Sequence, residues 1–333
     1  MKRPYIIAEI GINHEGKYNN IKKLILAAKR AGADAVKFQI FKAETLADTN
    51  LKVKKFFYSK NKKETLYEMW KRLELDNKKL NLINILCKKV KIDLIFSVFD
   101  NQSLLRLKKI KFKFIKIASS DINDFPLLKQ IKKYRKKIIV STGMANTKEI
   151  KKIINFLSRK KIFLLHCVSL YPCPLNKINL KRIYSLKKKF NIEVGFSDHT
   201  IGVSACLMAL SNGANIIEKH FTLNKKLDGP DHILSADETE LKIICDFSKK
   251  INLLNGNGII NPSKDEFKML KFARKSIYVK KNISKYEPFT NDNLIIRRPK
   301  GFFDPIHLNN IINKKSSKNL KSGTNLKYKH IKN

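Results

Sequence analysis

The sequence predicts an α/β fold, a closed (β/α)8 TIM barrel followed by a small domain of short strands and turns. Eight short apolar runs alternate with helix-length segments over about the first 250 residues. Polar residues gather after nearly every run, as they do at the catalytic face of a barrel. The alternative is a doubly wound sheet, but no Gly-x-Gly-x-x-Gly motif follows the first run.

The expected elements follow one another in a regular order. A glycine closes the first helix at Gly32, and another closes the seventh at Gly213, as is typical of helix ends. Strands are expected at residues 5–10, 35–38, 94–98, 114–117, 138–140, 163–165, 194–196 and 215–217. Helices are expected at residues 21–31, 77–90, 103–109, 126–133, 147–158, 178–190, 203–210 and 239–254.

The pattern changes after residue 258. We expect a barrel over residues 1–258, a linker over 259–274 and a separate small domain over 275–333. Within the barrel, residues 41–75 form a longer excursion. Its 46–57 portion is either a loop over an active site or part of a surface excursion with one helix.

The composition indicates a globular cytoplasmic protein. Hydrophobic residues make up 43% of the 333 residues, enough for a large core. We expect no membrane span and no signal peptide, because no apolar run is long enough and the first strand begins almost at once. The five cysteines are odd in number and form no Cys-x-x-Cys pair, so we expect reduced, mainly structural thiols.

The formal net charge of +42 raises the possibility of a non-enzymatic polyanion-binding protein. However, only ten of the 70 basic residues are Arg, and the lysines are spread along the whole chain. No helix-turn-helix, zinc-finger or RNA-binding motif accompanies them. We therefore interpret the charge as compositional bias and expect no specific nucleic-acid partner.

Two histidines are candidate metal ligands. His199 and His220 follow the seventh and eighth runs, beside the acidic residues Asp198 and Glu218. Parallel strands deliver such residues to one face, and neutral imidazole is a common ligand for divalent metals. The alternative is that one or both histidines satisfy local hydrogen bonds only.

Two lysines and three serines predict an anion pocket at the same face. Lysine supplies a point charge for phosphate, and hydroxyls supply directional hydrogen bonds. The residues are Lys37, Lys116, Ser119, Ser141 and Ser197. The alternative is that Lys37 points outward on an edge strand. If it is instead buried in the barrel, it needs a charged partner. A metal beside a phosphate pocket suits joining a phosphorylated enol to an aldehyde, phosphosugar isomerisation or an aldolase reaction.

Ordered motifs from about residue 4 to residue 255 resemble the sialic acid synthases, which are phosphoenolpyruvate-dependent nonulosonate synthases. The motifs are IAEIGINHEG, ADAVKFQ, KIASSD, STGM, HCVSLYP, GFSDHT, EKHFT and GPDH. About 60 C-terminal residues are similar to the antifreeze-like (SAF) domain of that family, most clearly at RRPKG.

The resemblance implies a domain-swapped homodimer that condenses phosphoenolpyruvate with N-acetylmannosamine and releases phosphate. N-acetylneuraminate synthase is the leading hypothesis. A legionaminic acid-type synthase that uses 2,4-diacetamido-2,4,6-trideoxymannose is the alternative. An inactive homologue is disfavoured because the residue set is complete. The resemblance further implies a divalent metal, Mn²⁺ or Mg²⁺, on His199 and His220.

The resemblance also assigns roles to single residues. Phosphoenolpyruvate would be held by Lys37, Lys116, Ser119, Ser141, Ser197 and Ser169. The sugar would contact Glu9, Gln39, Phe99, Asp121, Tyr171 and Asp231, with Arg298 reaching in from the partner subunit.

Two positions depart from the family pattern, because Ser169 stands where Asn is frequent and Asp121 where Glu is frequent.

In the expected reaction C3 of the enol attacks the aldehyde and water traps the cation at C2. Loss of phosphate then gives the 2-keto acid. The base is Glu9 or a metal-bound water, or Glu9 is only a hydrogen-bond partner of the sugar.

Overall fold

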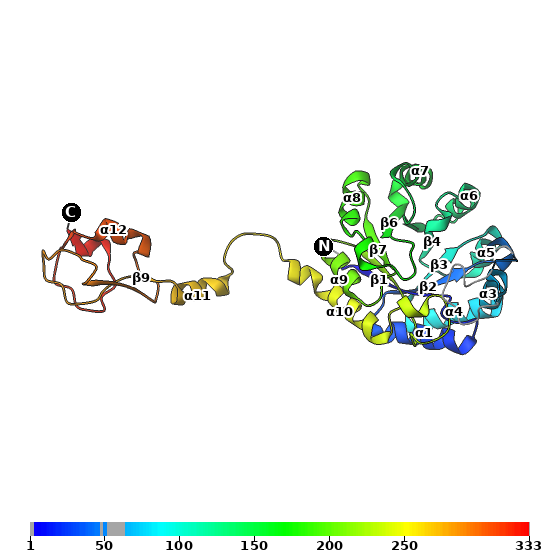
Figure 1. Ribbon diagram of the computed structural model, residues 1–333, viewed down its shortest axis with the longest axis horizontal. Helices are drawn as coiled ribbons and strands as arrows, with labels where there is room; N and C mark the ends of the chain where they lie inside the picture. Colours follow the sequence, from blue (N-terminus) through cyan, green and yellow to red (C-terminus); the bar gives the residue numbers. More distant parts are fainter. Residues whose placement is uncertain (1–2, 47–48, 52–63, 333) are drawn as a thin grey trace. The chain divides into compact units, whose positions relative to one another are not determined.

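The computed structural model describes residues 3–46, 49–51 and 64–332. Eight parallel strands form a closed barrel in chain order, with β8 paired to β1 (Figure 1). The strands are β1 (Tyr5–Gly11), β2 (Ala35–Ile40), β3 (Asp93–Val98), β4 (Phe114–Ile117), β5 (Lys137–Ser141), β6 (Ile162–Cys167), β7 (Val194–Asp198) and β8 (Ile216–His220). The predicted barrel is therefore confirmed.

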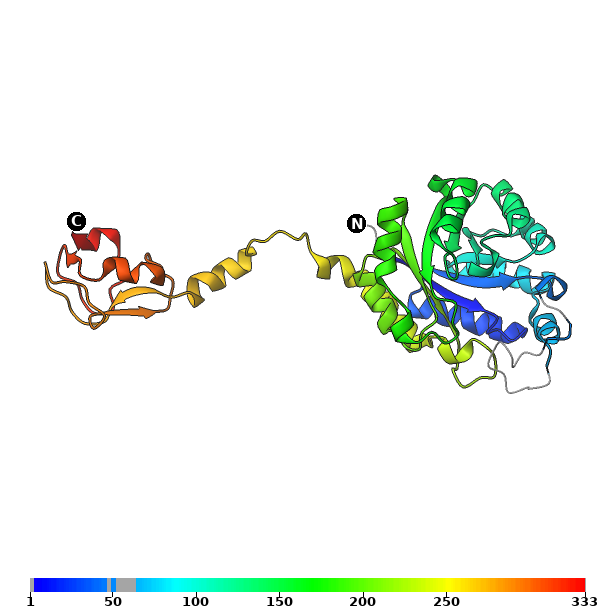
Figure 2. The ribbon, with the colours of Figure 1, turned by 45° about the horizontal axis from the view of Figure 1, so that its top comes forward.

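Helices surround the strands, as the two ribbon views show (Figures 1 and 2). They are α1 (Tyr18–Ala31), α2 (Ala43–Leu46), α3 (Leu66–Leu73), α4 (Asn77–Val90), α5 (Asn101–Arg106), α6 (Phe125–Lys133), α7 (Thr147–Leu157), α8 (Lys181–Phe190), α9 (Ser204–Ser211) and α10 (Glu238–Asn255). Local sequence explains their ends. Asp76 and Asn146 accept hydrogen bonds from first-turn amides of α4 and α7, and α1 ends at Gly32 with a φ of 91°.

Two predicted helices differ from the structure. The segment predicted as a helix at 103–109 splits into α5 and a 3₁₀ turn at Leu107–Lys109. The helix predicted from residue 178 begins at Lys181, after a 3₁₀ turn at Leu175–Lys177. Apolar spacing predicts the first of these regions, but it does not distinguish 3₁₀ from α hydrogen bonding. In the second, residues 178–180 are not helical, and the 3₁₀ turn lies before the predicted start.

The barrel interior is built in layers by the two-residue period of the strands. The lowest inward layer is apolar and consists of Ile7, Ala35, Ile95, Phe114, Ile139, Leu165 and Ile216. Two residues further along each strand, the next inward layer is largely polar. It consists of Glu9, Lys37, Ser97, Lys116, Ser141, Cys167, Ser197 and Glu218.

The strand ends require a correction. We predicted that polar clusters follow the strands, with the last two strands ending at residues 196 and 217. The structure extends β7 to Asp198 and β8 to His220, so Ser197, Glu218 and His220 lie within strands. Strand pairing uses only the backbone, and the inward polar side chains find partners across the barrel.

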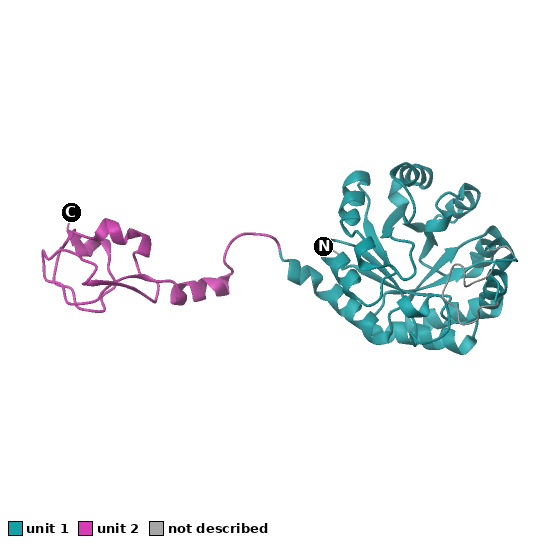
Figure 3. Cartoon of the chain, in the orientation of Figure 1, with its two compact units in different colours: residues 1–256 teal, residues 257–333 magenta. Residues whose placement is uncertain are grey.

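A second compact unit comprises residues 257–333, and the first comprises residues 1–256 (Figure 3). The boundary falls two residues before the predicted one. The unit contains α11 (Lys264–Ala273), the antiparallel pair β9 (Ser276–Val279) and β10 (Leu294–Arg297), α12 (Leu308–Ile311), and the short pair β11 (Lys315–Ser316) and β12 (Ile331–Lys332). It has its own small core, which includes Ile277 and Phe289.

Helix α11 occupies much of the segment predicted as a linker. Most of the predicted 46–57 loop lies outside the described residues. Within the described part of the chain, we find no helix with the length and apolarity that a bilayer crossing needs.

Candidate functional site

The polar inward layer contains a buried ion network. Lys37 Nζ lies 3.0 Å from Glu218 Oε1 and 3.3 Å from Glu9 Oε1. Lys116 Nζ lies 3.4 Å from the same Glu218 oxygen, and Ser197 Oγ donates a hydrogen bond of 2.9 Å to it. The charged side chains are at most 4% exposed. Lys37 is therefore an inward, paired lysine and not an outward one on an edge strand.

Glu218 was not among the predicted site residues, although it is the centre of this network. The sequence carried two signals for it. A buried lysine requires a charged partner, and Glu218 lies two positions before His220, on the same side of a strand. Treating Glu218 as a residue of the following loop concealed this relation.

The network separates the pKa values of its two carboxylates. Burial raises the pKa of Glu9, and the nearby Glu218 carboxylate adds to this effect, although Lys37 opposes it. Burial would also raise the pKa of Glu218, but Lys116 and Lys37 outweigh burial and hold that pKa well below its usual range. The pKa values of the two carboxylates are thus shifted in opposite directions, that of Glu218 downwards and that of Glu9 upwards.

The two lysines respond differently to burial. Burial would lower the pKa of Lys37, but Glu218 and Glu9 raise it overall. Burial lowers the pKa of Lys116, which Glu218 offsets only in part. Glu9 Oε2 and Glu218 Oε2 are buried without a hydrogen-bond partner among the described residues. Such groups are costly unless a ligand or water completes them.

The predicted serines gather around Gly143. The Gly143 amide donates a hydrogen bond of 3.0 Å to Ser119 Oγ, which lies 3.3 Å from the Cys167 thiol. A Cβ at position 143 would lie only 2.4 Å from Ser169 Oγ and 2.8 Å from Ser119 Oγ, so only glycine fits. Ser141 Oγ is buried without a partner in the described part of the chain. The hydroxyls and the lysines therefore line one anion-friendly interior.

The two candidate metal ligands lie side by side. The ring centroids of His199 and His220 are 5.4 Å apart, and both side chains are buried. His199 Nδ1 lies 2.8 Å from the Val168 carbonyl oxygen, which can only accept, so Nδ1 carries the proton and Nε2 keeps its lone pair. His220 Nδ1 lies 3.3 Å from Asp231 Oδ2.

The surroundings of the imidazoles suit metal ligands. Burial, with the nearby charge of His220, lowers the pKa of His199 to about 4, so His199 is neutral at pH 7. Burial would lower the pKa of His220, but Asp231 outweighs it and raises that pKa. A second ring nitrogen held by a carbonyl, as in His199, is typical of metal-bound histidine. His220 Nδ1 has the Asp231 carboxylate beside it but makes no hydrogen bond within the described part of the chain. The described residues contain no cluster of three or more His, Cys, Asp or Glu side chains suited to a metal.

The predicted sugar-binding residues surround this centre in part. Gln39 Nε2 donates a hydrogen bond of 3.1 Å to Glu9 Oε1, and the Tyr171 ring stacks on His199 at 4.1 Å. Asp121 ends a 3₁₀ turn, Ser119–Asp121, and burial raises its pKa to about 6.

Two further predicted residues have other neighbours in the structure. Phe99 packs edge-to-face on Phe41, with ring centroids 6.2 Å apart. Arg298 belongs to the second unit, where it is exposed just after β10.

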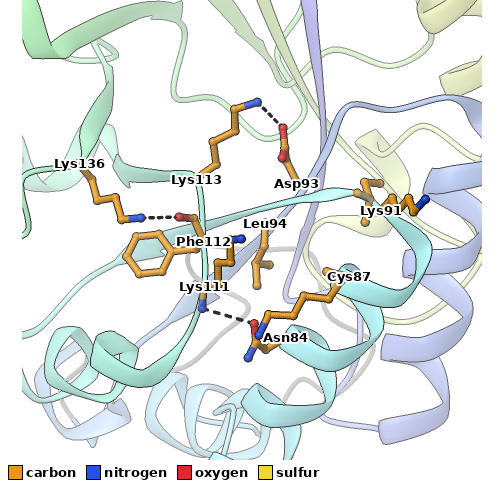
Figure 4. A pocket seen from close by; sticks show the side chains of 11 residues that line it. Asn84, Cys87, Lys91, Asp93, Leu94, Lys111, Phe112, Lys113 and Lys136 are labelled. Atoms are coloured by element: carbon orange, nitrogen blue, oxygen red, sulfur yellow. Dashed lines mark hydrogen bonds and ion pairs between the residues drawn. The ribbon is translucent and has the colours of Figure 1, made fainter.

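A cavity of about 620 Å³ lies apart from this site, beside α4 and the start of β3 (Figure 4). Five lysines line it, and it includes none of the predicted site residues. Lys113 pairs with Asp93, and Lys136 donates a hydrogen bond to the Phe112 carbonyl. The lysine excess of the chain thus extends to surfaces far from the strand ends.

Fold and site together define a barrel enzyme with a cationic, hydroxyl-rich interior beneath two imidazoles. The model of the NeuB family matches residues 24–260, and that of the SAF domain matches residues 274–332. The chain is 42% identical to an N,N'-diacetyllegionaminic acid synthase of Campylobacter jejuni, over 96% of this chain and 98% of that protein. It is 38% identical to the enzyme of the same name from Legionella pneumophila, over 98% and 94%.

A solved structure supports the same relation. The N-acetylneuraminic acid synthetase of Leptospira borgpetersenii, in complex with citrate, aligns with a TM-score of 0.71 at 33% identity, over 81% of this chain and 90% of that one. The chain therefore belongs to the NeuB family, the nonulosonic acid synthases, which condense phosphoenolpyruvate with a sugar. The family resemblance seen in the sequence is confirmed.

Proposed function

We propose that the protein is a legionaminic acid-type synthase, which joins phosphoenolpyruvate to 2,4-diacetamido-2,4,6-trideoxymannose and releases phosphate. The sequence alone favoured N-acetylmannosamine as the sugar. The relatives at 42% and 38% identity carry the diacetyllegionaminic name, whereas the sialic acid synthetase structure is 33% identical. Asp121, where the sialic acid synthase pattern frequently has Glu, agrees with a different sugar contact.

The buried Lys37–Glu218–Lys116 network carries the enzymatic part of the proposal. Two ammonium groups share one carboxylate oxygen, so they retain capacity for a further anion. We assign the phosphate and carboxylate of phosphoenolpyruvate to this pocket, with hydroxyls from Ser119, Ser141, Ser169 and Ser197. An anion bound there would draw Lys37 away from Glu9, which lies 3.3 Å from it, and would raise the pKa of Glu9 further.

Glu9 is our candidate base. As C3 of the enol attacks the aldehyde carbon, a cation develops at C2. Water adds to C2 and gives a proton to Glu9, whose pKa is already raised by burial and by Glu218. The aldehyde oxygen takes up the proton that Glu9 has accepted and becomes a hydroxyl. Loss of phosphate from C2, with the proton of the C2 hydroxyl passing to the departing phosphate, leaves the keto group. One water is consumed, and one phosphate is released.

We also propose a divalent ion, Mn²⁺ or Mg²⁺, on His199 and His220. The proton on His199 Nδ1 leaves Nε2 free, and the Asp231 carboxylate lies 3.3 Å from Nδ1 of the second ring. Such an ion supplies Lewis-acid polarisation of the sugar aldehyde when it is bound. Tyr171 packs on both rings and restricts their rotation.

A second copy of the chain is part of this proposal. All ten residues of α11 are described and none is buried, while its Phe267, Met269 and Phe272 are more than half exposed. Exposed apolar side chains of this size favour association. With the exposed Arg298 in the same unit, they support a homodimer in which that arginine serves the partner's site.

Phosphate release by the purified protein tests the function. We expect a higher kcat/KM for the diacetamido sugar than for N-acetylmannosamine, with phosphoenolpyruvate and Mn²⁺ present in both assays. A preference for N-acetylmannosamine would overturn the sugar assignment alone. No release with either sugar would overturn the proposed reaction, provided that the protein is folded and binds Mn²⁺.

A further inference from the structure

On β7 and β8, one residue beyond the polar inward layer, lies an outward pair that no step of the reaction uses. The strand register sets Ser197 opposite Glu218 and Asp198 opposite Lys219. Side chains alternate along a strand, so Asp198 and Lys219 lie behind the inward residues. Lys219 Nζ is 2.8 Å from Asp198 Oδ2, and both side chains have 0% exposure.

This pair also holds the residue that follows His199. The Thr200 amide donates a hydrogen bond of 2.9 Å to Asp198 Oδ1, and the Thr200 hydroxyl donates one of 3.2 Å to Asp198 Oδ2. Lys219 Nζ donates to the Thr200 carbonyl oxygen. His199 lies beyond the last residue of β7, so strand pairing does not fix its backbone, and its carbonyl oxygen accepts a hydrogen bond of 2.8 Å from the Cys173 amide. The ion pair in addition binds both polar backbone groups of Thr200.

The same pair is adjacent in sequence to both imidazoles. Asp198 precedes His199, and Lys219 precedes His220. A shift of one member therefore moves one ring relative to the other, whose centroid is 5.4 Å away.

We propose that the buried Asp198–Lys219 pair positions His199 and His220 at the spacing that a shared metal ion requires. The inference rests on the proposed metal role of the two histidines. Asp198 and Lys219 are positioning residues, since they lie behind the rings and act through the backbone at Thr200. A purely structural cross-link between β7 and β8 would stabilise the fold but would not set the metal affinity.

The double variant Asp198→Asn with Lys219→Met separates these two roles. Removal of one partner leaves an unpaired buried charge and destabilises strongly, whereas removal of both charges is frequently tolerated. The side-chain amide introduced at position 198 can still accept from the Thr200 amide, but the lysine donor to the Thr200 carbonyl is lost. The matched control is Cys206→Ala. Cys206 Sγ donates a hydrogen bond of 3.2 Å to Asp198 Oδ2, but within the described residues it makes no hydrogen bond to Thr200.

Metal-free protein is titrated with Mn²⁺ in a calorimeter without substrate, and melting temperatures are recorded for each variant. We expect the double variant to melt close to the wild-type temperature and to bind Mn²⁺ about 10- to 100-fold more weakly. Cys206→Ala should bind as the wild type does. If that double variant fails to fold, Asp198→Asn with Lys219→Leu, which also removes both charges and the donor to the Thr200 carbonyl, provides the same measurement.

A folded variant of the pair with wild-type Mn²⁺ affinity would overturn the inference. His220→Ala separates this from failure of the proposed metal function. If the wild type binds no Mn²⁺, or if His220→Ala binds it equally well, the metal assignment itself is wrong. If His220→Ala loses binding while the Asp198–Lys219 variant retains it, only the positioning role is wrong.

Discussion

Replacing Glu218 by Gln should destabilise the free protein and make its stability depend on bound phosphoenolpyruvate. Within the described residues, Glu218 is the only carboxylate that forms an ion pair with Lys116, and it is one of two that pair with Lys37. The change to Gln removes both of these ion pairs. Breaking a buried ion pair costs about 3–5 kcal/mol of unfolding free energy, because the remaining charge is uncompensated. For a domain of this size that corresponds to a fall in melting temperature of roughly 10 °C.

An anionic ligand should reverse much of this loss. In the wild type, phosphoenolpyruvate competes with Glu218 for the two ammonium groups, whereas in the variant it supplies the missing negative charge. At about 100 times its Kd a ligand adds about 2.7 kcal/mol of stability. We therefore expect a given phosphoenolpyruvate concentration to raise the melting temperature more in Glu218→Gln than in the wild type. Differential scanning fluorimetry across a concentration series measures both effects.

The matched control is Glu238→Gln. Glu238 pairs with Arg30 at 2.7 Å, but the two side chains are 42% and 61% exposed. An exposed pair contributes about 0–1 kcal/mol, so this variant should melt near the wild-type temperature with an unchanged response to ligand. Equal stability of Glu218→Gln and Glu238→Gln, or an equal ligand response in Glu218→Gln and wild type, would refute our account of the network.

Three further predictions concern other parts of the site. Because burial raises the pKa of Asp121 to about 6, its carboxylate becomes neutral as the pH falls through 6; KM for the sugar should then rise, and Asp121→Asn should abolish that dependence. Gly143→Ala places a methyl group 2.4 Å from Ser169 Oγ; we expect about a 100-fold fall in kcat/KM in phosphate-release assays, and wild-type kinetics would contradict the packing argument. Mixing Arg298→Ala with His220→Ala subunits should restore activity in about a quarter of sites or more, whereas two inactive parents that stay inactive when mixed would argue against a shared site.

Much of the fold could be predicted because the barrel repeats one pattern. Apolar runs of strand length and glycine stops such as Gly32 recur around the chain, and each repetition supports the others. Helix α4 was predicted with its observed bounds, Asn77–Val90, because Asp76 caps it and its apolar spacing is regular. Strand ends were less predictable, because the apolar runs end where the barrel interior becomes polar. In β7 and β8 this is two and three residues before the strand itself ends.

The sequence predicted a candidate site residue only where the residue type itself indicates a binding or metal-ligating role. Lys37 stands out because it is a charged residue inside an apolar run, and the two histidines stand out because imidazole is a common metal ligand. Glu218 was passed over because a carboxylate near a strand end is ordinary, and only its burial against Lys37 makes it informative. Arg298 lies in a separate unit, so local pattern says nothing about which site it serves.

The two-residue period of β7 and β8 identifies Glu218, which the sequence analysis did not include in the site. In the triplets Ser197-Asp198-His199 and Glu218-Lys219-His220, the first and third residues face inward and the middle ones face outward. The first pair is a hydrogen bond of 2.9 Å, the middle pair an ion pair of 2.8 Å, and the third a pair of imidazoles. Each pair is complementary only in this register, and a slip of one residue would turn both imidazoles away from the interior. The side-chain pairs therefore favour this register of β7 and β8, and the site in turn depends on that register.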